Sequence, residues 1–380
     1  MNSAAAPTQL APLLNSARVI VCCGPGGVGK TTTAAALGIA AAAAGRRVTV
    51  LTVDPARRLA NALGLTEFDG HSRVIEGAWP GELRATMLDA KSTFDGIVST
   101  YAADEAQADR ILNNRIYRNL SSALSGTQEY MAIEKLYELA TAPDADLVIV
   151  DTPPTRHALD VLDAPERLLR LLENKVFRAL MAPTKTYLKV VNAATQTLLR
   201  TVARTLGSDV IDDVVAFFRA FEGMEDGFRT RAQGVRAVLE APTTSFLLVC
   251  SARRDAVDES VFFARELVEH GHRLAALVVN RVHPSFDVSP ALGSGSANAS
   301  AGGSERGRSE LASDVAALVD NATQMTALAR REAQHITRVE REVAGAISVK
   351  VPLFFDDVHD LEGLAAIGSF LVGSAGSVST

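Results

Sequence analysis

The sequence predicts an α/β protein with a mostly parallel, doubly wound sheet that is covered by helices on both faces. Short apolar runs rich in β-branched residues alternate with longer helical stretches. Most of the runs are continuously apolar, as is typical of strands buried on both faces of a parallel sheet. A glycine-rich turn separates the first run from the first helical stretch. The expected strands are Val19–Cys23, Arg47–Val53, Leu83–Leu88, Leu147–Val150, Phe246–Ser251, Leu274–Asn280 and Ile347–Val351.

The glycine-rich turn has the sequence Gly-Pro-Gly-Gly-Val-Gly-Lys-Thr at residues 24–31. Strand, glycine loop and helix in this order are typical of a phosphate-binding loop, in which backbone N–H groups and the helix N-terminus surround a phosphate. A lysine at the end of the loop adds positive charge, and the following threonine hydroxyl can ligate Mg²⁺. The residues expected to bind phosphate are Gly26, Gly27, Val28, Gly29, Lys30, Thr31 and Thr32.

Two carboxylates follow expected strands and should meet at the carboxyl edge of the sheet, where doubly wound folds bind ligands. Asp54 follows the second strand, and Asp151 follows the strand that begins at Leu147. We expect Asp54 and Lys30 to be catalytic. Asp54 is the residue expected to orient an attacking water. The expected magnesium ligands are Thr31, Asp54 and Asp151, the last through water.

The size and charge of the chain restrict its functional class. The chain has 380 residues, of which 47% are hydrophobic, and a formal net charge of −6. A large core is therefore expected, and bulk charge does not favour nucleic acid as a partner. Residues 1–14 lack the basic start of a secretory signal, and the alanine-rich run from Ala34 to Ala44 is too short to span a bilayer. We expect a cytoplasmic protein, with peripheral association at a membrane as an alternative.

The cysteines and histidines do not predict a metal centre. Cys22, Cys23 and Cys250 lie in apolar runs without CxxC spacing, which favours buried strand residues. His270 and His272 lack a third ligand nearby in the sequence and are expected to be exposed polar residues. Neither a zinc site nor an arsenite site is expected.

The chain is expected to divide into a core and a helical insertion subdomain. Within the insertion, apolar residues recur at helical spacing from Leu188 to Leu206, and Val210, Val214, Phe217, Phe218 and Phe221 continue this pattern. Core packing is the favoured interpretation, and a groove for an apolar helix or a membrane face is the alternative. The sequence predicts one or two charged helices from Glu310 to Val343 and a final helix over Leu361–Leu371. The expected bounds are 15–90, 141–157 and 241–372 for the core, 287–309 for a flexible loop within it, 91–140 and 158–240 for the insertion, and 373–380 for a disordered tail.

Three motifs and two further segments resemble the ArsA/TRC40 family, which includes the arsenite-pump ATPase and the ATPase that targets tail-anchored membrane proteins. The motifs are the glycine loop, Asp54-Pro55-Ala56, and the segment from Asp151 to His157; the other segments are 126–130 and 278–281. The likeness extends to residues 351–353, and it is nearest to the actinobacterial anion-transporting-ATPase-like members.

The resemblance implies a P-loop NTPase of the SIMIBI class with a variant Walker A motif. It implies that ATP and Mg²⁺ are the cofactors, that Asp54 lies in the first switch, and that residues 151–157 form the second. It also implies that Asn280, Arg281, Pro352 and Leu353 hold the nucleotide, with the segment 351–354 against adenine. A dimer and a membrane-protein client are the implied partners.

Pro25 departs from the pattern of this family, which usually has at this position a lysine that reaches the nucleotide of a partner subunit. Proline supplies neither the charge nor an N–H group. The chain is therefore expected either to form a heterodimer with a paralogous ATPase that carries the lysine, or to form a homodimer that hydrolyses ATP slowly or with another cation such as Arg156. Three other functions stay open: a partitioning-type regulatory ATPase, an energising subunit for anion efflux without arsenite specificity, and, because of Pro25, a nucleotide sensor without enzymatic activity.

Overall fold

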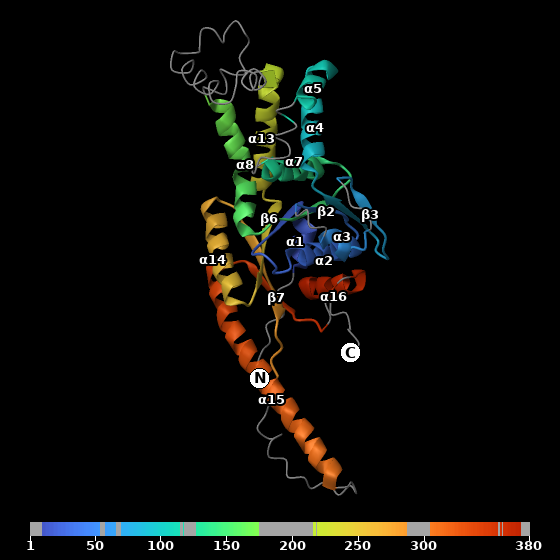
Figure 1. The fold of residues 1–380 in the computed structure, drawn as a ribbon, viewed down its shortest axis with the longest axis vertical. Coiled ribbons are helices and arrows are strands. Elements are labelled where there is room, and N and C mark those ends of the chain that lie inside the picture. Colours follow the sequence, from blue (N-terminus) through green and yellow to red (C-terminus); the bar gives the residue numbers. More distant parts are fainter. Residues whose placement is uncertain are drawn as a thin grey trace.

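The computed structural model describes residues 10–53, 58–65, 70–114, 117, 127–174, 216–217, 219–286, 305–355, 358 and 360–373. An eight-stranded sheet forms the centre of the molecule (Figure 1). The strands are β1 (Val19–Cys23), β2 (Arg47–Thr52), β3 (Arg73–Ile75), β4 (Glu82–Met87), β5 (Leu147–Asp151), β6 (Thr244–Ser251), β7 (Leu274–Val282) and β8 (Ile347–Pro352).

The sheet has the order β3-β4-β2-β5-β1-β6-β7-β8 and confirms the predicted fold class. Every pairing is parallel except that of β3 with β4. The chain first builds the side that contains β2 and then crosses to the side that begins with β6, so that the order reverses around β1. In doubly wound sheets, ligands bind beyond the carboxyl ends of strands at such a reversal.

Helices cover both faces of the sheet. On one face lie α1 (Ala11–Ser16), α2 (Lys30–Ala43), α3 (Arg58–Ala62) and α16 (Leu361–Val372). The other face is covered by α7 (Thr127–Thr141), α13 (Glu225–Glu240), α14 (Arg254–Glu269) and α15 (Glu305–Glu342). The final helix, α16, matches its predicted position closely.

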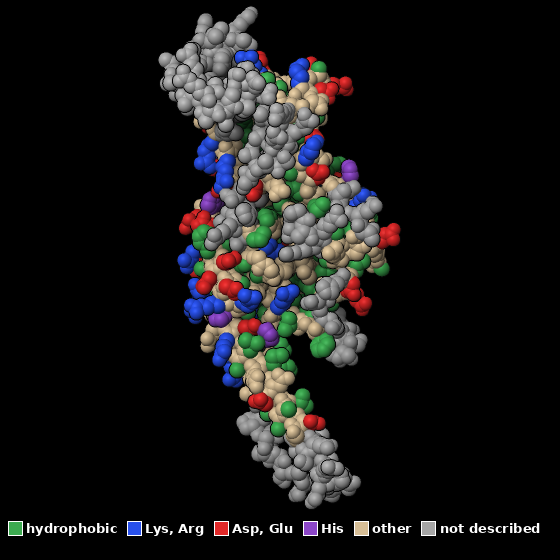
Figure 2. Space-filling view, in the orientation of Figure 1, with side chains coloured by type: hydrophobic (Ala, Val, Ile, Leu, Met, Phe, Trp, Pro, Cys, Tyr) green, Lys and Arg blue, Asp and Glu red, His purple; other side chains and the backbone are tan. Residues whose placement is uncertain are grey.

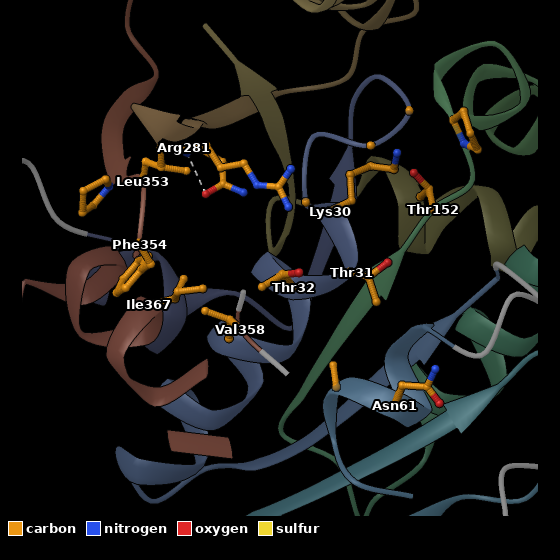
Figure 3. A pocket seen from close by; sticks show the side chains of 17 residues that line it. Lys30, Thr31, Thr32, Asn61, Thr152, Arg281, Leu353, Phe354, Val358 and Ile367 are labelled. Carbon is orange, nitrogen blue, oxygen red and sulfur yellow. Dashed lines mark hydrogen bonds between the residues drawn. The ribbon is translucent and has the colours of Figure 1, made fainter. Parts of the chain in front are cut away.

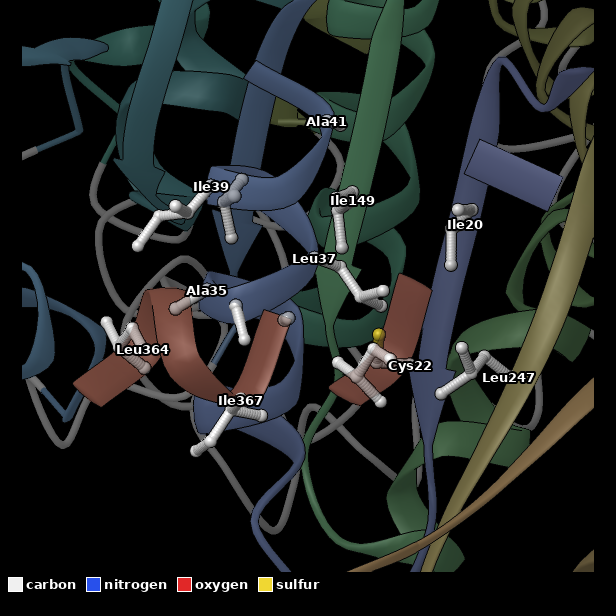
Figure 4. Close-up of a cluster of buried hydrophobic side chains, with 14 of the residues drawn as sticks. Ile20, Cys22, Ala35, Leu37, Ile39, Ala41, Ile149, Leu247, Leu364 and Ile367 are labelled. Atoms are coloured by element: carbon white, nitrogen blue, oxygen red, sulfur yellow. The ribbon is translucent and has the colours of Figure 1, made fainter. Parts of the chain in front are cut away.

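Side chains of β1 alternate between the two hydrophobic clusters that these helices form with the sheet. Ile20 and Cys22 belong to the first cluster, which Figure 4 shows with Leu37 of α2 and Ile367 of α16. Cys23 belongs to the second cluster, as does Cys250 of β6. The predicted burial of all three cysteines is therefore confirmed.

At one end of the sheet, helices extend away from the body (Figure 1). They include α4 (Ala90–Tyr101), α5 (Glu105–Leu112) and α8 (Thr155–Glu173), together with α13. A third hydrophobic cluster joins them and contains Phe217 and Phe221, whose ring centroids lie 5.0 Å apart. Core packing is thus confirmed for these two rings, whereas Phe218 and the predicted amphipathic stretch from Leu188 to Leu206 lie outside the described residues.

Two sequence predictions about elements need correction. The antiparallel strand β3 was not predicted, because it is only three residues long at the edge of the sheet, with Val74 53% exposed. The helix predicted from Glu310 begins earlier, at Glu305, inside the segment expected to be a flexible loop. Residues 287–304 and 374–380 lie outside the described part of the chain.

The surface of α14 and α15 carries ion pairs rather than charge of one sign. Arg265 of α14 binds Glu342 of α15 through two hydrogen bonds of 2.5 and 2.9 Å. Figure 2 shows acidic and basic side chains interspersed along this side of the body.

His270, just after α14, is exposed as predicted, whereas His272 is half-buried and its ring lies 4.7 Å from that of Phe246. Among the described residues, no helix combines the length and the apolar character needed to cross a bilayer.

Candidate active site

The glycine loop connects β1 to α2 at the carboxyl end of the central strands. Gly29 has φ +97°, in the left-handed region that favours glycine, and a Cβ there would lie only 2.3 Å from Nδ2 of Asn280. The same Nδ2 donates a hydrogen bond to the carbonyl oxygen of Val28 at 2.9 Å. Asn280 belongs to β7 and is 6% exposed. The loop is therefore shaped by a neighbouring strand as well as by its own glycines.

Lys30 begins α2 and is largely buried. Its ammonium donates hydrogen bonds to the carbonyl oxygens of Gly24 at 3.0 Å and Pro25 at 2.9 Å. A buried ammonium needs such acceptors, because removing it from water without them is costly. A phosphate oxygen inside the loop would meet this charge together with the N-terminus of α2.

Beside the loop, the carboxylate of Asp151 lies at the end of β5 and is 1% exposed. Its Oδ2 accepts hydrogen bonds from the Thr31 hydroxyl at 2.7 Å and from the Thr52 hydroxyl at 3.1 Å. Hydroxyl and carboxylate oxygens are the donor types that Mg²⁺ prefers at nucleotide sites. The residues present therefore fit this cation, with Thr31 and Asp151 as the groups that would hold it.

A cleft of about 740 Å³ opens beside the loop (Figure 3). Its polar side is formed by the loop and the first turn of α2. Its other side is apolar and comes from the segment after β8 and from α16, as Phe354 and Ile367 show. Such a cleft suits a ligand with a charged end and a flat apolar end. The predicted site residues that line it are Gly26, Gly27, Gly29, Lys30, Thr31, Thr32, Asn280, Arg281, Pro352 and Leu353.

Some predicted site residues lie elsewhere. Val28 does not line this cleft but lines a neighbouring cavity of about 410 Å³, to which Pro25 and Arg281 also contribute. Asp54 lies outside the described residues. The side chains of Arg156 and His157 are likewise outside the description, although α8 begins at Thr155.

The structure adds site residues that the sequence did not single out. Thr52 was missed because its role depends on the parallel register that places it opposite Asp151. Thr152 follows Asp151 directly, and its hydroxyl donates to the carbonyl oxygen of Cys22 at 2.9 Å, which ties β5 to β1 just before the loop. Thr152 and Pro154 both belong to the segment 151–157 that the resemblance already assigned to the second switch, and the lining residues that the sequence did not indicate are Asn61, Ala62, Val358 and Ile367.

Arg281 has an unusual backbone. Its φ of 59° makes it the one residue other than glycine with a positive φ in the described part of the chain. The pairing of β7 with β8 shifts register between Val279 and Val282, and Oδ1 of Asn280 accepts a hydrogen bond from the Arg281 N–H at 3.0 Å. The left-handed conformation costs about 1 kcal/mol for a residue with a Cβ. Bulges and strain of this kind recur beside functional sites, where they direct side chains.

This combination of a glycine loop after a central parallel strand, a buried lysine, and a carboxylate bound to the loop threonine defines a P-loop nucleotide-hydrolysing protein. The sequence profile of the anion-transporting ATPase family matches residues 17–292, and the chain belongs to that family. The chain is accordingly an ATPase, and nucleotide binding is part of its function.

Relatives named as ATPases of the GET3 type share this sequence at moderate identity. The ATPase get3 of Aspergillus terreus is 25% identical over 261 residues, which cover 68% of this chain and 71% of the relative. The ATPase GET3 of Pyricularia oryzae is 32% identical over 160 residues, 41% of this chain and 46% of the relative. These similarities agree with the family assignment.

Proposed function

We propose that this chain binds ATP and Mg²⁺ in the cleft beside the glycine loop and hydrolyses the nucleotide to ADP and phosphate. The observation that carries the proposal is the 2.7 Å hydrogen bond between Thr31 and Asp151, because it joins a pair of magnesium-ligand types to a phosphate loop. The proposed phosphate-binding residues are those of the loop from Gly26 to Thr32. Thr31, Asp54 and Asp151 are the proposed magnesium site, and Asn280, Arg281, Pro352 and Leu353 are further residues proposed to contact the nucleotide.

In the proposed reaction, a water oxygen attacks the γ-phosphorus and the bond to the β–γ bridging oxygen breaks. Asp54 orients the water, and Lys30 places its positive charge where negative charge develops. When bound, Mg²⁺ supplies further neutralisation of the phosphate oxygens. The loop N–H groups hold the phosphates in line for this attack.

We further propose that hydrolysis switches the helical insertion, residues 91–140 and 158–240. The helix α8 begins at Thr155, within the second proposed switch, and packs against α7 and α13. A change at Asp151 can therefore reach the insertion directly through α8, most of which belongs to the insertion. On the family resemblance, the insertion handles a membrane-protein client from the cytoplasm, as part of a dimer.

Pro25 favours a heterodimer, in which a paralogous ATPase supplies the loop lysine. Phosphate release by the purified chain should therefore be slow and should rise in the Pro25→Lys variant. Fast release by the natural chain, with no gain in Pro25→Lys, would argue against this partner.

The nucleotide proposal is tested by calorimetry with ADP and Mg²⁺, alongside phosphate release from ATP. Natural protein should bind ADP, whereas Lys30→Ala should lose binding or turnover while it keeps its melting temperature within a few degrees. The absence of any ADP binding by the natural chain, alone or with a co-purified partner, would refute the proposal.

A further inference from the structure

Arg281 stands between the two cavities that flank the glycine loop. It lines the cleft of about 740 Å³ and also the cavity of about 410 Å³ that contains Pro25. Both spaces include Gly26 and Gly27 of the loop. Figure 3 shows the Arg281 side chain running from the end of β7 into the cleft, toward the glycine loop and Lys30. The guanidinium therefore faces the loop from its open side.

Among the described residues, no side chain pairs with the charge of Arg281 to stabilise the fold. Within the described residues, the guanidinium forms no hydrogen bond, ion pair or ring contact. By contrast, Arg253, which lines the same smaller cavity, binds Asp255 at 2.7 Å. A second pair in this cavity, His283 with Glu332, is joined at 2.7 Å. Arg281 is thus a cation with no partner among the residues that the structure describes, beside a loop that is built to hold an anion.

The backbone at this position is held in a conformation that arginine disfavours. Glycine or asparagine would adopt φ near +60° more readily. The register shift between β7 and β8 and the hydrogen bond from the Arg281 N–H to Asn280 accompany this conformation, and the side chain lines the cleft. An arginine in this disfavoured conformation points to a use for its side chain rather than its backbone.

We propose that Arg281 binds the phosphates of the nucleotide from the open side of the loop, and so supplies positive charge on the side where Pro25 supplies none. This inference rests on the proposed nucleotide function. Lys30 is held on the inner side by the carbonyl oxygens of Gly24 and Pro25. A guanidinium can meet two phosphate oxygens with two parallel N–H groups, which an ammonium cannot do.

The test compares three variants by calorimetry, with a non-hydrolysable ATP analogue, ADP and adenosine as ligands. Arg281→Gly removes the cation and relieves the backbone, so a loss of binding cannot come from strain. We expect about tenfold weaker binding of the ATP analogue and ADP, unchanged binding of adenosine, and a melting temperature that is unchanged or higher. Arg281→Lys should restore only part of the affinity. Arg253→Ala, the matched control from the neighbouring cavity, should bind all three ligands as the natural chain does.

Two results would overturn the inference while leaving the proposed function intact. Natural affinity for all three ligands in Arg281→Gly would show that the side chain does not bind nucleotide. An equal loss for adenosine and ADP would place it on the nucleoside instead. If the natural chain binds none of these ligands, the proposed function itself fails.

Discussion

The Thr31 hydroxyl lies 2.7 Å from Oδ2 of Asp151 and donates a hydrogen bond to it. This contact joins the first turn of α2 to the end of β5, although 120 residues separate the two in sequence. Thr52 donates to the same oxygen from β2. Three elements of the sheet edge are therefore fixed around one buried carboxylate.

Replacing this carboxylate by an amide should distinguish the contribution of Asp151 to folding stability from its contribution to magnesium-dependent hydrolysis. In Asp151→Asn, the amide oxygen can still accept from both hydroxyls, so the melting temperature should change by only a few degrees. Magnesium-dependent phosphate release should fall about a hundredfold, because the anionic ligand is lost. A titration of activity against Mg²⁺, with ADP binding in chelator as the control, checks this. Undiminished activity in Asp151→Asn would exclude the proposed role.

Asp54 is expected to act on hydrolysis and not on binding. The Asp54→Asn variant should bind ADP with natural affinity but release phosphate about a hundredfold more slowly, as is typical when a water-orienting or proton-accepting group is removed. Single-turnover phosphate release measures this step directly. Natural turnover in the variant would mean that another group orients the water.

Because Asn280 approaches the loop closely, alanine substitutions at two glycines should differ in their effect on ADP binding. Gly29→Ala and Gly45→Ala both place a Cβ at positive φ, 97° and 87°, and each should lose about 1 kcal/mol of folding stability from this strain. At Gly45, no atom of the described residues, its two chain neighbours aside, lies within 4 Å of the added Cβ, whereas at Gly29 it meets Asn280. ADP binding should therefore be lost only in Gly29→Ala. Equal binding by both variants would contradict this view of the loop.

A buried ion pair between α7 and α13 should be important for stability. Glu134 is fully buried, accepts from Nε of Arg231 at 2.6 Å, and also accepts from the Tyr130 hydroxyl. Arg231→Ala should lower the free energy of unfolding by about 3 kcal/mol, because it leaves a buried carboxylate without its cation. The control, Arg236→Ala, removes an exposed pair with Glu240 in the same helix and should cost less than about 0.5 kcal/mol. Urea unfolding of both variants checks the difference, and similar losses would disprove it.

The three cysteine thiols should not react with thiol reagents in the folded protein. Burial raises the pKa of Cys22 and Cys23 well above the ordinary range and raises that of Cys250 to about 11. Since the thiolate is the reactive form, a raised pKa leaves less of it at any given pH, and burial blocks access as well. A thiol reagent at mildly alkaline pH should label the chain only after denaturation. Fast labelling of native protein would show that one of these strands opens.

Much of the fold could be predicted because its central strands are continuously apolar, as in β1 and β5. The edge strand β3 could not, since only Ile75 of its three residues is buried and so short a segment carries no such pattern. The site was predictable where chemistry is local, as in the glycine loop and in Asp151 at a strand end. Thr52 depends on strand register, and the conformation of Arg281 depends on a bulge, so neither leaves a signal in the sequence. Ile367 of the cleft resembles any other core residue of α16.

The two carbonyl oxygens that accept hydrogen bonds from Lys30 also affect the stability of the fold when no nucleotide is bound. A buried cation that could be neutralised only by a ligand would make folding conditional on that ligand. Here the main chain itself satisfies the ammonium. The protein is therefore expected to fold without nucleotide, so that binding a nucleotide is a step separate from folding.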